Sequence, residues 1–361
     1  MNITIIAGAR PNFMKIAPLV RIINAEQERG KKLSYRMVYT GSDNDFNTDK
    51  TLFSDLGMPQ PDACLGIESN DFFERFAGIL VAFARDLESH PADLVMVVDD
   101  MTPTMACSIV AKKKGVKVAH LVAGIRSFDM DMPKEVNRMI TDGLSDYFFT
   151  AGMNSNRNLN QTGTEQSRVY FVGNILIDTL RYNCPRFIRP NVLAETNIKD
   201  GEYILFTLNR RAVCDNSELL KSLIETLIKE SKLPVVAPLH SYVAEKIRNL
   251  NLNLERFHIL PPLPYLEFGH MEKNAAGIVT DSGNVAEEAT FLGIPCITLS
   301  DYAEHPETVN IGTNVLVNDN PEKLAEALQQ LQRGEWKKSA LPERWDGHTA
   351  ERIIQILEEI G

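Results

Sequence analysis

Hydrophobic residues along this chain form short continuous runs that alternate with longer segments of helical spacing. The short runs are rich in β-branched residues and lie at 3–8, 35–41, 93–100, 116–124, 146–152 and 169–174. Between them, apolar residues recur every three to four positions over 15–28, 71–89, 102–115 and 134–145. Strands that alternate with helices predict βα units around a parallel sheet.

The same alternation returns after a polar stretch at 181–202 that contains two prolines. The expected strands are 202–209, 234–240, 257–263, 275–283 and 295–300, and the expected helices are 216–232, 242–251, 284–293, 321–334 and 348–360. A chain of 361 residues exceeds what one hydrophobic core usually supports. We therefore predict an α/β protein of two doubly wound Rossmann-like domains facing a cleft. They would be residues 1–180, joined by the C-terminal helix 348–361, and residues 181–347.

Composition and charge narrow the class of protein. With 44% hydrophobic and 24% charged residues, the chain is typical of globular proteins, and no stretch approaches the roughly 20 apolar residues that span a bilayer. A net charge of −10 without a basic block argues against a nucleic-acid binder. The five cysteines include no CxxC pair and are expected to be free thiols in a reducing compartment. We expect a cytoplasmic protein without a nucleic-acid or membrane partner.

The turn after the first expected strand has the features of an anion site. Gly8 ends the strand, and Arg10 and Lys15 lie at the mouth and first turn of the following helix. Cations and the free amides of a helix N-terminus both attract anions. A capped helix with solvated charges explains the same residues, because a full GxGxxG pattern is absent.

The sequence TDSGN at 280–284 predicts a second anion site. Gly283 lets the backbone approach a ligand closely, and the Ser282 hydroxyl with free helix amides could hold a phosphate. Of the adjacent acids Glu287 and Glu288, at most one faces the ligand, because neighbouring helix residues point about 100° apart. A carboxylate there would suit ribose hydroxyls, or it would simply complement the helix dipole. Phe268, just upstream, could stack on a base or belong to the core.

Several segments together resemble the UDP-N-acetylglucosamine 2-epimerase family. They are GARPNFMKIAPL, PDLVMVVDDMTPTMAC, HLVAGIRSFDMDMPKEVNR, TDGLSDYFFT, VGNILIDTL, TDSGNVAEEATFLGIPCITL, EHPETVNIGTNVLV and DGHTAERI, in order from residue 8 to residue 353. The resemblance implies a GT-B-like fold and a UDP-N-acetylhexosamine ligand, epimerised at C2 by elimination and re-addition of UDP. It also implies a cytoplasmic homodimer that uses no metal or other cofactor.

Carried over position by position, the nucleotide half of the site resembles the family pattern. Arg10 and Lys15 match the phosphate-proximal cations, and Arg126 falls in a substrate-contacting segment. The remaining matches are Phe268 for uracil stacking, Ser282 and Gly283 for the diphosphate, Glu288 for the ribose, and His240 for a histidine of that domain.

The sugar half departs from the family pattern. Asp100 stands where an acid is expected, but Val122 replaces a glutamate, and Lys134 replaces the first acid of a PEE motif, leaving Glu135. An expected histidine is Asn209 and an expected arginine is His305, so both are candidate substrate contacts. Asp100 and Glu135 are the remaining candidate catalytic acids. Removal of the C2 proton needs a placed base, which valine cannot supply.

Three functions follow from this pattern. The first is a 2-epimerase that works through a rearranged acid–base set. The second is a catalytically silent UDP-sugar-binding protein, which could regulate a sister epimerase. The third, from fold analogy alone, is a GT-B-type glycosyltransferase. Asp99 precedes Asp100, which is the candidate base for removal of the C2 proton. We expect Asp99 to be an exposed loop acid and Asp100 alone to face the cleft.

Overall fold

The computed structural model describes residues 1–43, 45–69 and 71–361. Its chain forms two compact units, each built on one parallel sheet. Unit 1 contains Met1–Tyr182 and Glu343–Gly361, and unit 2 contains Asn183–Pro342. Within the described ranges, no helix is both long enough and apolar enough to cross a membrane.

The sheet of unit 1 has seven strands in the order β3-β2-β1-β4-β5-β6-β7. Their bounds are Asn2–Ala7 (β1), Ser34–Tyr39 (β2), Ala63–Cys64 (β3), Leu94–Val98 (β4), Lys117–Leu121 (β5), Tyr147–Thr150 (β6) and Val169–Phe171 (β7). All neighbours are parallel, and Ile5 of β1 is paired with both Met37 and Met96. The strand order reverses between β1 and β4, and the carboxyl ends of strands at such a point are where doubly wound sheets bind ligands.

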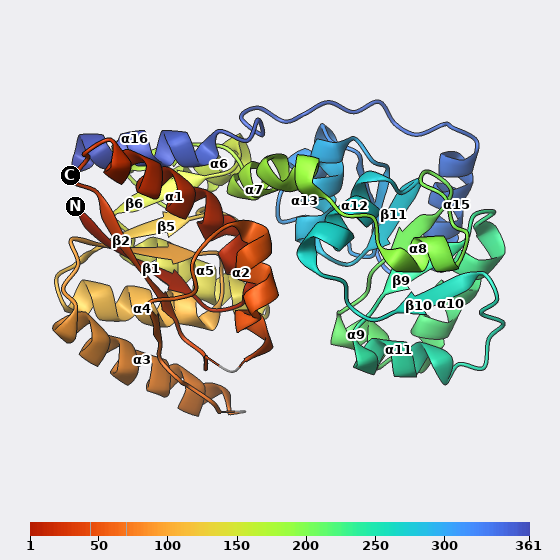
Figure 1. The fold of residues 1–361 in the computed structure, drawn as a ribbon, viewed down its shortest axis with the longest axis horizontal. Helices are drawn as coiled ribbons and strands as arrows, with labels where there is room; N and C mark the ends of the chain where they lie inside the picture. Colours follow the sequence, from red (N-terminus) through yellow and green to blue (C-terminus); the bar gives the residue numbers. More distant parts are fainter. Residues whose placement is uncertain (44, 70) are drawn as a thin grey trace. The chain divides into compact units, whose positions relative to one another are not determined.

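Helices cover both faces of this sheet (Figure 1). On one face lie α1 (Arg10–Glu28) and α16 (Thr349–Ile360), which pack against each other. On the other, α3 (Phe72–Ser89) and α4 (Thr102–Lys113) bury apolar residues against β1, β2, β4 and β5. Packed on α4 is α5 (Pro133–Leu144). The unit also contains α2 (Lys50–Leu56), α6 (Met153–Gln161), most of α7 (Ile175–Asn183) and the 3-10 turns Phe46–Thr48 and Gln166–Arg168.

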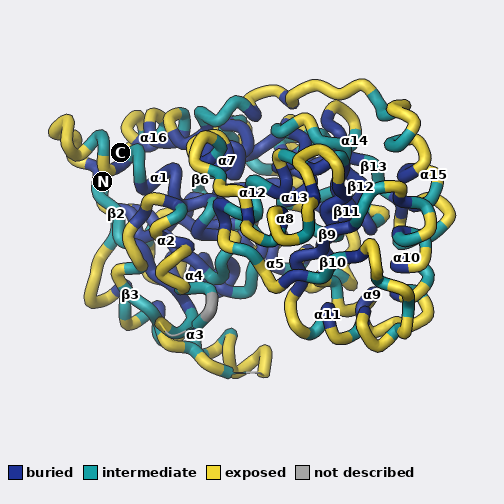
Figure 2. Tube along the Cα trace, turned by 45° about the vertical axis from the view of Figure 1, so that its right-hand side comes forward, coloured by how far each residue is buried: buried dark blue, intermediate teal, exposed yellow. Residues whose placement is uncertain are grey.

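The sheet of unit 2 has six parallel strands in the order β10-β9-β8-β11-β12-β13. Their bounds are Ile204–Phe206 (β8), Val235–Pro238 (β9), Phe257–Leu260 (β10), Gly277–Thr280 (β11), Cys296–Thr298 (β12) and Asn314–Leu316 (β13). The strands β8, β9, β11 and β12 are buried throughout, and the edge strands β10 and β13 are partly buried (Figure 2). The order again reverses beside the first strand, between β8 and β11, so the doubly wound prediction holds for both sheets.

Two apolar clusters hold the helices of unit 2 against its sheet. One contains residues of α10 (Ser217–Glu230), α11 (Ser241–Arg248) and α15 (Pro321–Gln332). The other contains residues of α8 (Asn191–Glu195), α12 (Tyr265–Lys273) and α13 (Gly283–Leu292). The short helices α9 (Arg211–Cys214) and α14 (Glu307–Asn310) and the 3-10 turn Cys184–Arg186 complete the unit.

The C-terminal segment is fixed to unit 1 by specific contacts. Trp345 is fully buried, and its Nε1 donates to the carbonyl of Ala151 at 3.0 Å. The first amides of α16, those of Thr349 and Ala350, donate to the Asp178 carboxylate at 3.1 and 2.7 Å. Because α16 has no side-chain cap of its own, this carboxylate from α7 supplies the missing acceptor.

Every strand and helix predicted from the hydrophobic pattern is present, with shifts at the ends. The largest shift is in α1, which begins at Arg10 rather than at residue 15, with Pro11 in its first turn. The pattern missed short edge strands such as β3 and β13, and it missed the helices α2, α6, α7 and α12. None of these helices is longer than nine residues, which is too short to show a helical period clearly.

Candidate functional site

In unit 1, the cation at the start of α1 is paired with an acid from the turn after β4. Lys15 Nζ lies 2.6 Å from Asp99 Oδ1, and the Asn12 amide donates to Asp99 Oδ2 at 2.8 Å. Lys15 is 5% exposed. Arg10, one turn earlier, is partly buried, and burial lowers the pKa of its guanidinium although Asp49 and Asp55 act in the opposite direction.

Asp99 is therefore not the exposed loop acid that we expected. Its side chain is 15% exposed, and its φ of 59° is in the left-handed region, which aspartate tolerates better than most residues. The prediction was wrong because the pattern could not show that the turn after β4 lies against the first turn of α1.

Replacing Asp99 by asparagine keeps the turn but removes the charge that Lys15 faces. We expect the free energy of unfolding to fall by about 1–3 kcal/mol, because a buried ammonium loses its charged acceptor. Urea denaturation measures this loss. Asp131→Asn is the matched control, since Asp131 is exposed in the loop before α5. Equal stability of the two variants would contradict the role given to the Lys15–Asp99 pair.

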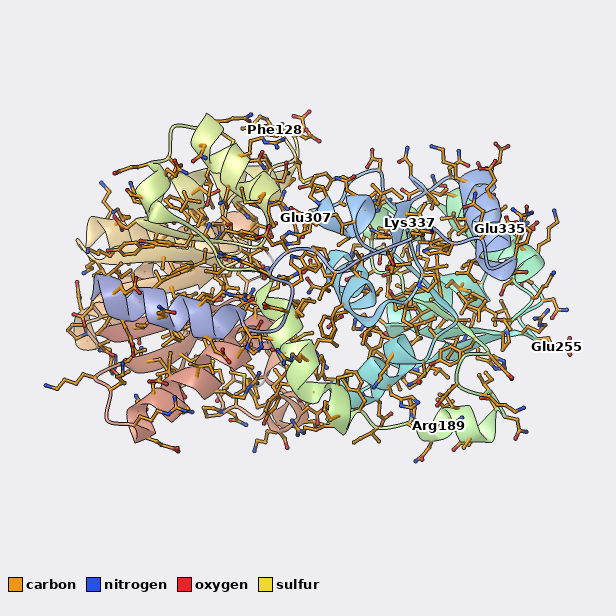
Figure 3. All side chains as sticks on the ribbon, turned by 90° about the horizontal axis from the view of Figure 1, so that it is seen from above. Phe128, Arg189, Glu255, Glu307, Glu335 and Lys337 are labelled. Atoms are coloured by element: carbon orange, nitrogen blue, oxygen red, sulfur yellow. The ribbon has the colours of Figure 1, made fainter. Side chains whose placement is uncertain are left out.

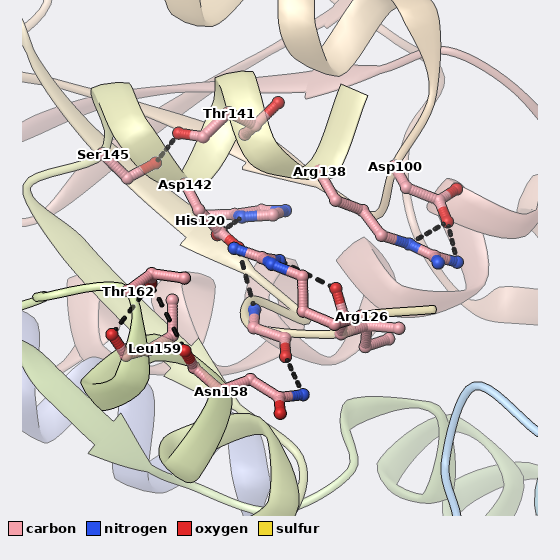
Figure 4. Close-up of polar contacts among 12 residues, drawn as sticks. Asp100, His120, Arg126, Arg138, Thr141, Asp142, Ser145, Asn158, Leu159 and Thr162 are labelled. Carbon is pink, nitrogen blue, oxygen red and sulfur yellow. Dashed lines mark hydrogen bonds and ion pairs between the residues drawn. The ribbon is translucent and has the colours of Figure 1, made fainter. Parts of the chain in front are cut away.

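Asp100, the candidate base, is held by two cations of α5. Arg138 donates to Asp100 Oδ2 through Nε at 2.9 Å and through Nη2 at 2.6 Å (Figure 4). Lys134 Nζ lies 3.4 Å from Asp100 Oδ1. The Arg138 side chain is 2% exposed, whereas that of Lys134 is 56% exposed. Arg138 thus fixes the carboxylate, and Lys134 covers its other oxygen from the solvent side.

Glu135, the second candidate acid, points into the protein. Its Oε2 accepts from the backbone amide and the hydroxyl of Ser127, both at 2.8 Å, and lies 3.4 Å from Arg138 Nη1. Arg126 Nε lies 3.9 Å from Glu135 Oε1. Glu135 is 1% exposed. These contacts give Glu135 a clear structural function, which is to order the loop that precedes α5.

A buried histidine of β5 links the turn after β4 to α5. His120 Nδ1 lies 2.6 Å from Asp142 Oδ1, and its Nε2 lies 2.8 Å from the Asp99 carbonyl oxygen. Asp142 also lies 2.6 Å from Arg126 Nη1. Burial acts to raise the pKa of Asp142, but the charges and hydrogen bonds of His120 and Arg126 outweigh it, so the pKa lies below its usual value. Arg126, a predicted substrate contact, is 8% exposed within this network.

The loop between β5 and α5 has a constrained backbone. Val122, which replaces the expected glutamate, has a φ of 68°, and this is a true outlier for a β-branched residue. Phe128, labelled in Figure 3, has a φ of 60° and an exposed side chain. Strained backbone of this kind persists only where the surroundings enforce it, and it is common at functional sites. The loop therefore keeps a demanding shape although its expected acid is gone.

A cavity of about 860 Å³ opens at the carboxyl ends of β1, β2 and β4. It is lined by Gly8 after β1, Thr40 after β2 and Asp100 after β4. Lys134 and Arg75 bring positive charge to its wall, and Asp45 and Glu68 bring negative charge. Asp100, Lys134 and Arg75 therefore line one cavity. It lies at the edge of the sheet where ligands of this fold class bind.

In unit 2, the N-terminus of α13 has no side-chain cap, and the Glu304 carboxylate lies beside it, since a Cβ added to Gly283 would be 3.5 Å from Glu304 Oε2. Ser282 is the N-cap residue of α13, but its side chain makes no capping bond, and Gly283 is exposed. The first amides of this ten-residue helix therefore keep their capacity to bind an acceptor. Asn284 lies in the first turn of the helix.

Asp281 organises the neighbouring loop. Its Oδ2 accepts from the backbone amides of Asn209 at 2.7 Å and Arg210 at 2.6 Å. Burial raises the pKa of this carboxyl, although both amides act in the opposite direction. Asn209, a predicted substrate contact, is exposed beside the turn. The pattern analysis did not single out Asp281, although its position directly before Ser282 was a signal.

The other predicted residues of unit 2 differ in exposure. Phe268 lies on α12, partly buried against an apolar cluster, and His240 is exposed as the N-cap residue of α11. His305 is buried, with its Nε2 3.7 Å from Glu287 Oε1. Glu288 is 2% exposed, and its charge adds to burial in raising the pKa of Glu272.

No group of three or more histidine, cysteine or acidic residues suited to a metal occurs within residues 1–43, 45–69 and 71–361. Asp129 and Asp131, the DxD pair before α5, are exposed, and the Asp131 amide donates to Asp129 Oδ1 at 3.0 Å.

Comparison with known proteins identifies the family. The UDP-N-acetylglucosamine 2-epimerase family model matches residues 25–358. The chain is 34% identical to the UDP-N-acetylglucosamine 2-epimerase of Methanocaldococcus jannaschii, over 99% of each chain. The chain belongs to the UDP-N-acetylglucosamine 2-epimerase family.

Further relatives bear on fold and ligand. A crystal structure of the M. jannaschii UDP-GlcNAc 2-epimerase in complex with UDP-GlcNAc and UDP aligns with a TM-score of 0.87 and 34% identity, covering 99% of this chain and 100% of that one. The UDP-2,3-diacetamido-2,3-dideoxy-D-glucuronate 2-epimerase of Pseudomonas aeruginosa is 34% identical, covering 91% of this chain and 92% of that protein. The lipopolysaccharide outer core galactosyltransferase WaaB, 15% identical with a TM-score of 0.58, shares the fold alone. The predicted family and GT-B-like α/β fold are confirmed.

Proposed function

We propose that this protein binds a UDP-N-acetylhexosamine and inverts its C2 by eliminating UDP and adding it back. The uncapped N-terminus of α13 carries the proposal, because Ser282 and Gly283 leave helix amides where a diphosphate can accept from them. A relative with 34% identity was crystallised with UDP-GlcNAc and UDP, which supports the same ligand class.

In this proposal, unit 2 holds the nucleotide. Phe268 stacks on the uracil, the Ser282 hydroxyl binds the diphosphate, and Glu288 accepts from the ribose hydroxyls. His240, Asn209 and His305 complete the substrate contacts of this unit. Arg10, Lys15 and Arg126 are the substrate contacts proposed for unit 1.

The chemical step in this proposal depends on Asp100 and Lys134. Asp100 takes the C2 proton once the Lys134 ammonium, which is largely exposed, moves away from the carboxylate. The displaced ammonium then stabilises the charge that develops on the departing diphosphate. When UDP adds back to C1, a proton from solvent is delivered to C2 on the face opposite Asp100, and this inverts the centre. Arg138 keeps Asp100 in place throughout, since both of its hydrogen bonds reach the other carboxylate oxygen.

A catalytically silent UDP-sugar-binding protein is the second candidate. The observation in its favour is that both oxygens of Asp100 already contact cations, while Val122 offers no group that transfers a proton. Such a protein would bind the ligand and could act as a partner of an intact epimerase.

An acidic sugar is a further option for the substrate. The P. aeruginosa relative is named for a glucuronate derivative, and the cavity of unit 1 has Arg75 and Lys134 on its wall. A carboxylate on the sugar would attract Lys134 away from Asp100 and thereby expose the base.

Nuclear magnetic resonance in D₂O tests these options together. UDP-GlcNAc and a UDP-linked diacetamido-glucuronate are each incubated with the protein, and deuterium at C2 is followed beside a UDP titration by calorimetry. Deuterium incorporation with the 2-epimer supports the epimerase. Tight UDP binding without exchange for either sugar supports the silent protein, and the absence of UDP binding excludes both.

Phe268→Ala and Ser282→Ala are each expected to weaken UDP binding. Loss of base stacking removes about 1–3 kcal/mol, and loss of a hydrogen bond to a charged group removes a similar amount, so each Kd should rise about 5- to 150-fold. Ser217→Ala is the control, because Ser217 is an exposed serine in the first turn of α10. If the affinity for UDP is unchanged in both test variants, the proposed nucleotide site is wrong.

By family likeness we also propose a cytoplasmic homodimer. Sedimentation equilibrium of the purified chain, alone and mixed with an intact epimerase, distinguishes a self-dimer from a mixed dimer.

A further inference from the structure

A buried histidine interrupts the otherwise apolar strand β5. His120 is 1% exposed, and the rest of the strand from 118 to 121 is buried and apolar. Residue 120 is paired with Val97 of β4 and with Phe148 of β6, so it lies inside the sheet rather than at an edge. Burial of a polar ring is costly unless hydrogen bonds compensate for it. The hydrogen bonds of His120 therefore indicate the role of the ring.

One hydrogen bond of His120 holds the peptide that precedes Asp100. The Nε2 atom lies 2.8 Å from the carbonyl oxygen of Asp99. A carbonyl oxygen only accepts hydrogen bonds, so Nε2 carries a hydrogen and donates it. This carbonyl belongs to the planar peptide unit that ends at the nitrogen and Cα of Asp100. The orientation of that peptide therefore sets the point from which the Asp100 side chain extends.

The other ring nitrogen fixes the orientation of the ring. His120 Nδ1 lies 2.6 Å from Asp142 Oδ1 (Figure 4). Two lone pairs would repel each other at this distance, so a hydrogen lies between these two atoms as well. The second oxygen of Asp142 lies 2.6 Å from Arg126 Nη1, which holds the carboxylate in place. As a result, α5 keeps the ring in the orientation that directs Nε2 to the turn after β4.

The turn after β4 has a backbone that needs such support. Asp99 has a φ of 59°, a conformation that persists in non-glycine residues only where the surroundings enforce it. The Asp99 carboxylate is bound by Lys15 of α1, and the Asp100 carbonyl accepts from Asn137 Nδ2 of α5 at 2.9 Å. His120 holds the peptide that lies between these two contacts.

We propose that His120 is a positioning residue for Asp100, because its Nε2 hydrogen bond holds the Asp99–Asp100 peptide in the orientation in which Asp100 lines the cavity of unit 1. The inference rests on the proposed function, in which Asp100 takes the C2 proton. His120 is buried and acts through the backbone of the turn. A displacement of about 1 Å in a catalytic group can lower a rate about 10²-fold, so a single bond to this peptide matters.

Two substitutions separate the bond to the turn from the packing of the ring. The amide of glutamine reaches about as far as Nε2, so His120→Gln keeps a donor for the Asp99 carbonyl. The amide of asparagine reaches only about as far as Nδ1, so His120→Asn keeps a partner for Asp142 and loses the donor to the turn. His90→Asn, at the exposed C-cap of α3, is the control. The kinetics of deuterium incorporation at C2 and a UDP titration by calorimetry compare the four proteins.

We expect His120→Asn to lower kcat for C2 exchange about 10- to 10²-fold. Its KM and its affinity for UDP should change little, because the base does not hold the nucleotide. His120→Gln should retain most of the rate, and His90→Asn should behave as the unaltered protein does. Equal values of kcat in the asparagine and glutamine variants would overturn the proposal, since the packing of the ring would then explain the effect. A change in KM alone would also contradict it.

Nuclear magnetic resonance tests the hydrogen bond without any activity. An HNCO spectrum correlates the Asp100 amide with the Asp99 carbonyl carbon and so reports on this one peptide. The peak should move in His120→Asn and stay near its original position in His120→Gln. In the unaltered protein, the hydrogen on His120 Nε2 should be protected from exchange with solvent. An unprotected hydrogen would refute the proposal even if neither variant folds.

Failure of the proposed function gives a different result. If the unaltered protein exchanges no deuterium at C2 of either sugar, the epimerase proposal is wrong, and the part of His120 in that reaction falls with it. The HNCO peak then still decides whether His120 orients the turn. If the unaltered protein does exchange deuterium and the asparagine variant exchanges it equally fast, only the positioning role is wrong.

Discussion

Replacing Arg138 by leucine is expected to lower the free energy of unfolding of unit 1 by about 3–5 kcal/mol. Arg138 is 1% exposed and bridges the two buried acids Asp100 and Glu135. Leucine fills much of the volume but leaves both carboxylates without this cation. An uncompensated buried charge costs far more than the ion pair itself contributes.

The chain offers a direct readout for this variant. Of its two tryptophans, Trp345 is buried in unit 1 and Trp336 belongs to unit 2. In a Trp336→Phe background, Trp345 fluorescence during urea denaturation reports on unit 1 alone. Arg85→Leu, at an exposed position of α3, should change stability by no more than about 0.5 kcal/mol. A similarly small effect of Arg138→Leu would mean that the network does not stabilise the unit.

Asp100→Asn is expected to reduce deuterium incorporation at C2 about 10²- to 10⁴-fold, if the protein is an active epimerase. Asparagine keeps the size of the side chain but cannot accept a proton at neutral pH. The UDP contacts proposed for unit 2 are unaltered, so the affinity for UDP should remain. A fall in exchange with unchanged UDP binding would assign Asp100 to the chemical step.

Two controls make the Asp100 result interpretable. Asp131→Asn changes an exposed acid before α5 and should leave exchange unchanged. Circular dichroism at the assay temperature checks that the Asp100 variant is folded, because Arg138 loses its charged partner. Full exchange in a folded Asp100→Asn protein would place the base elsewhere.

The sequence predicted the elements of the fold well, because buried parallel strands are continuous apolar runs and covering helices show a 3.6-residue period. The long helix α3 was predicted at 71–89 and occurs at Phe72–Ser89. Elements with weaker local signals were missed. Two- and three-residue edge strands such as β3 and β13 are too short to show a pattern, and so are helices of nine residues or fewer such as α6 and α12.

The candidate site was only partly predictable. Local motifs identified Asp100, Glu135 and the Ser282–Gly283 turn as candidates, and their roles remain predictions. Motif spacing did not show that Arg138 holds Asp100 or that Lys15 pairs with Asp99. The residues of the Lys15–Asp99 pair are 84 positions apart and those of the Asp100–Arg138 pair are 38 apart, so no local pattern records either contact.

By itself, then, the sequence determined the fold class and the family, since these depend on residue identity and local periodicity. The tertiary structure decided which charges meet. Lys134 alone could be read as a solvated lysine or as a cation of the site, and the packing of α5 beside the turn after β4 places it 3.4 Å from Asp100. Protonation and ion pairing depend on distance and burial, and both are set by contacts between elements remote in sequence.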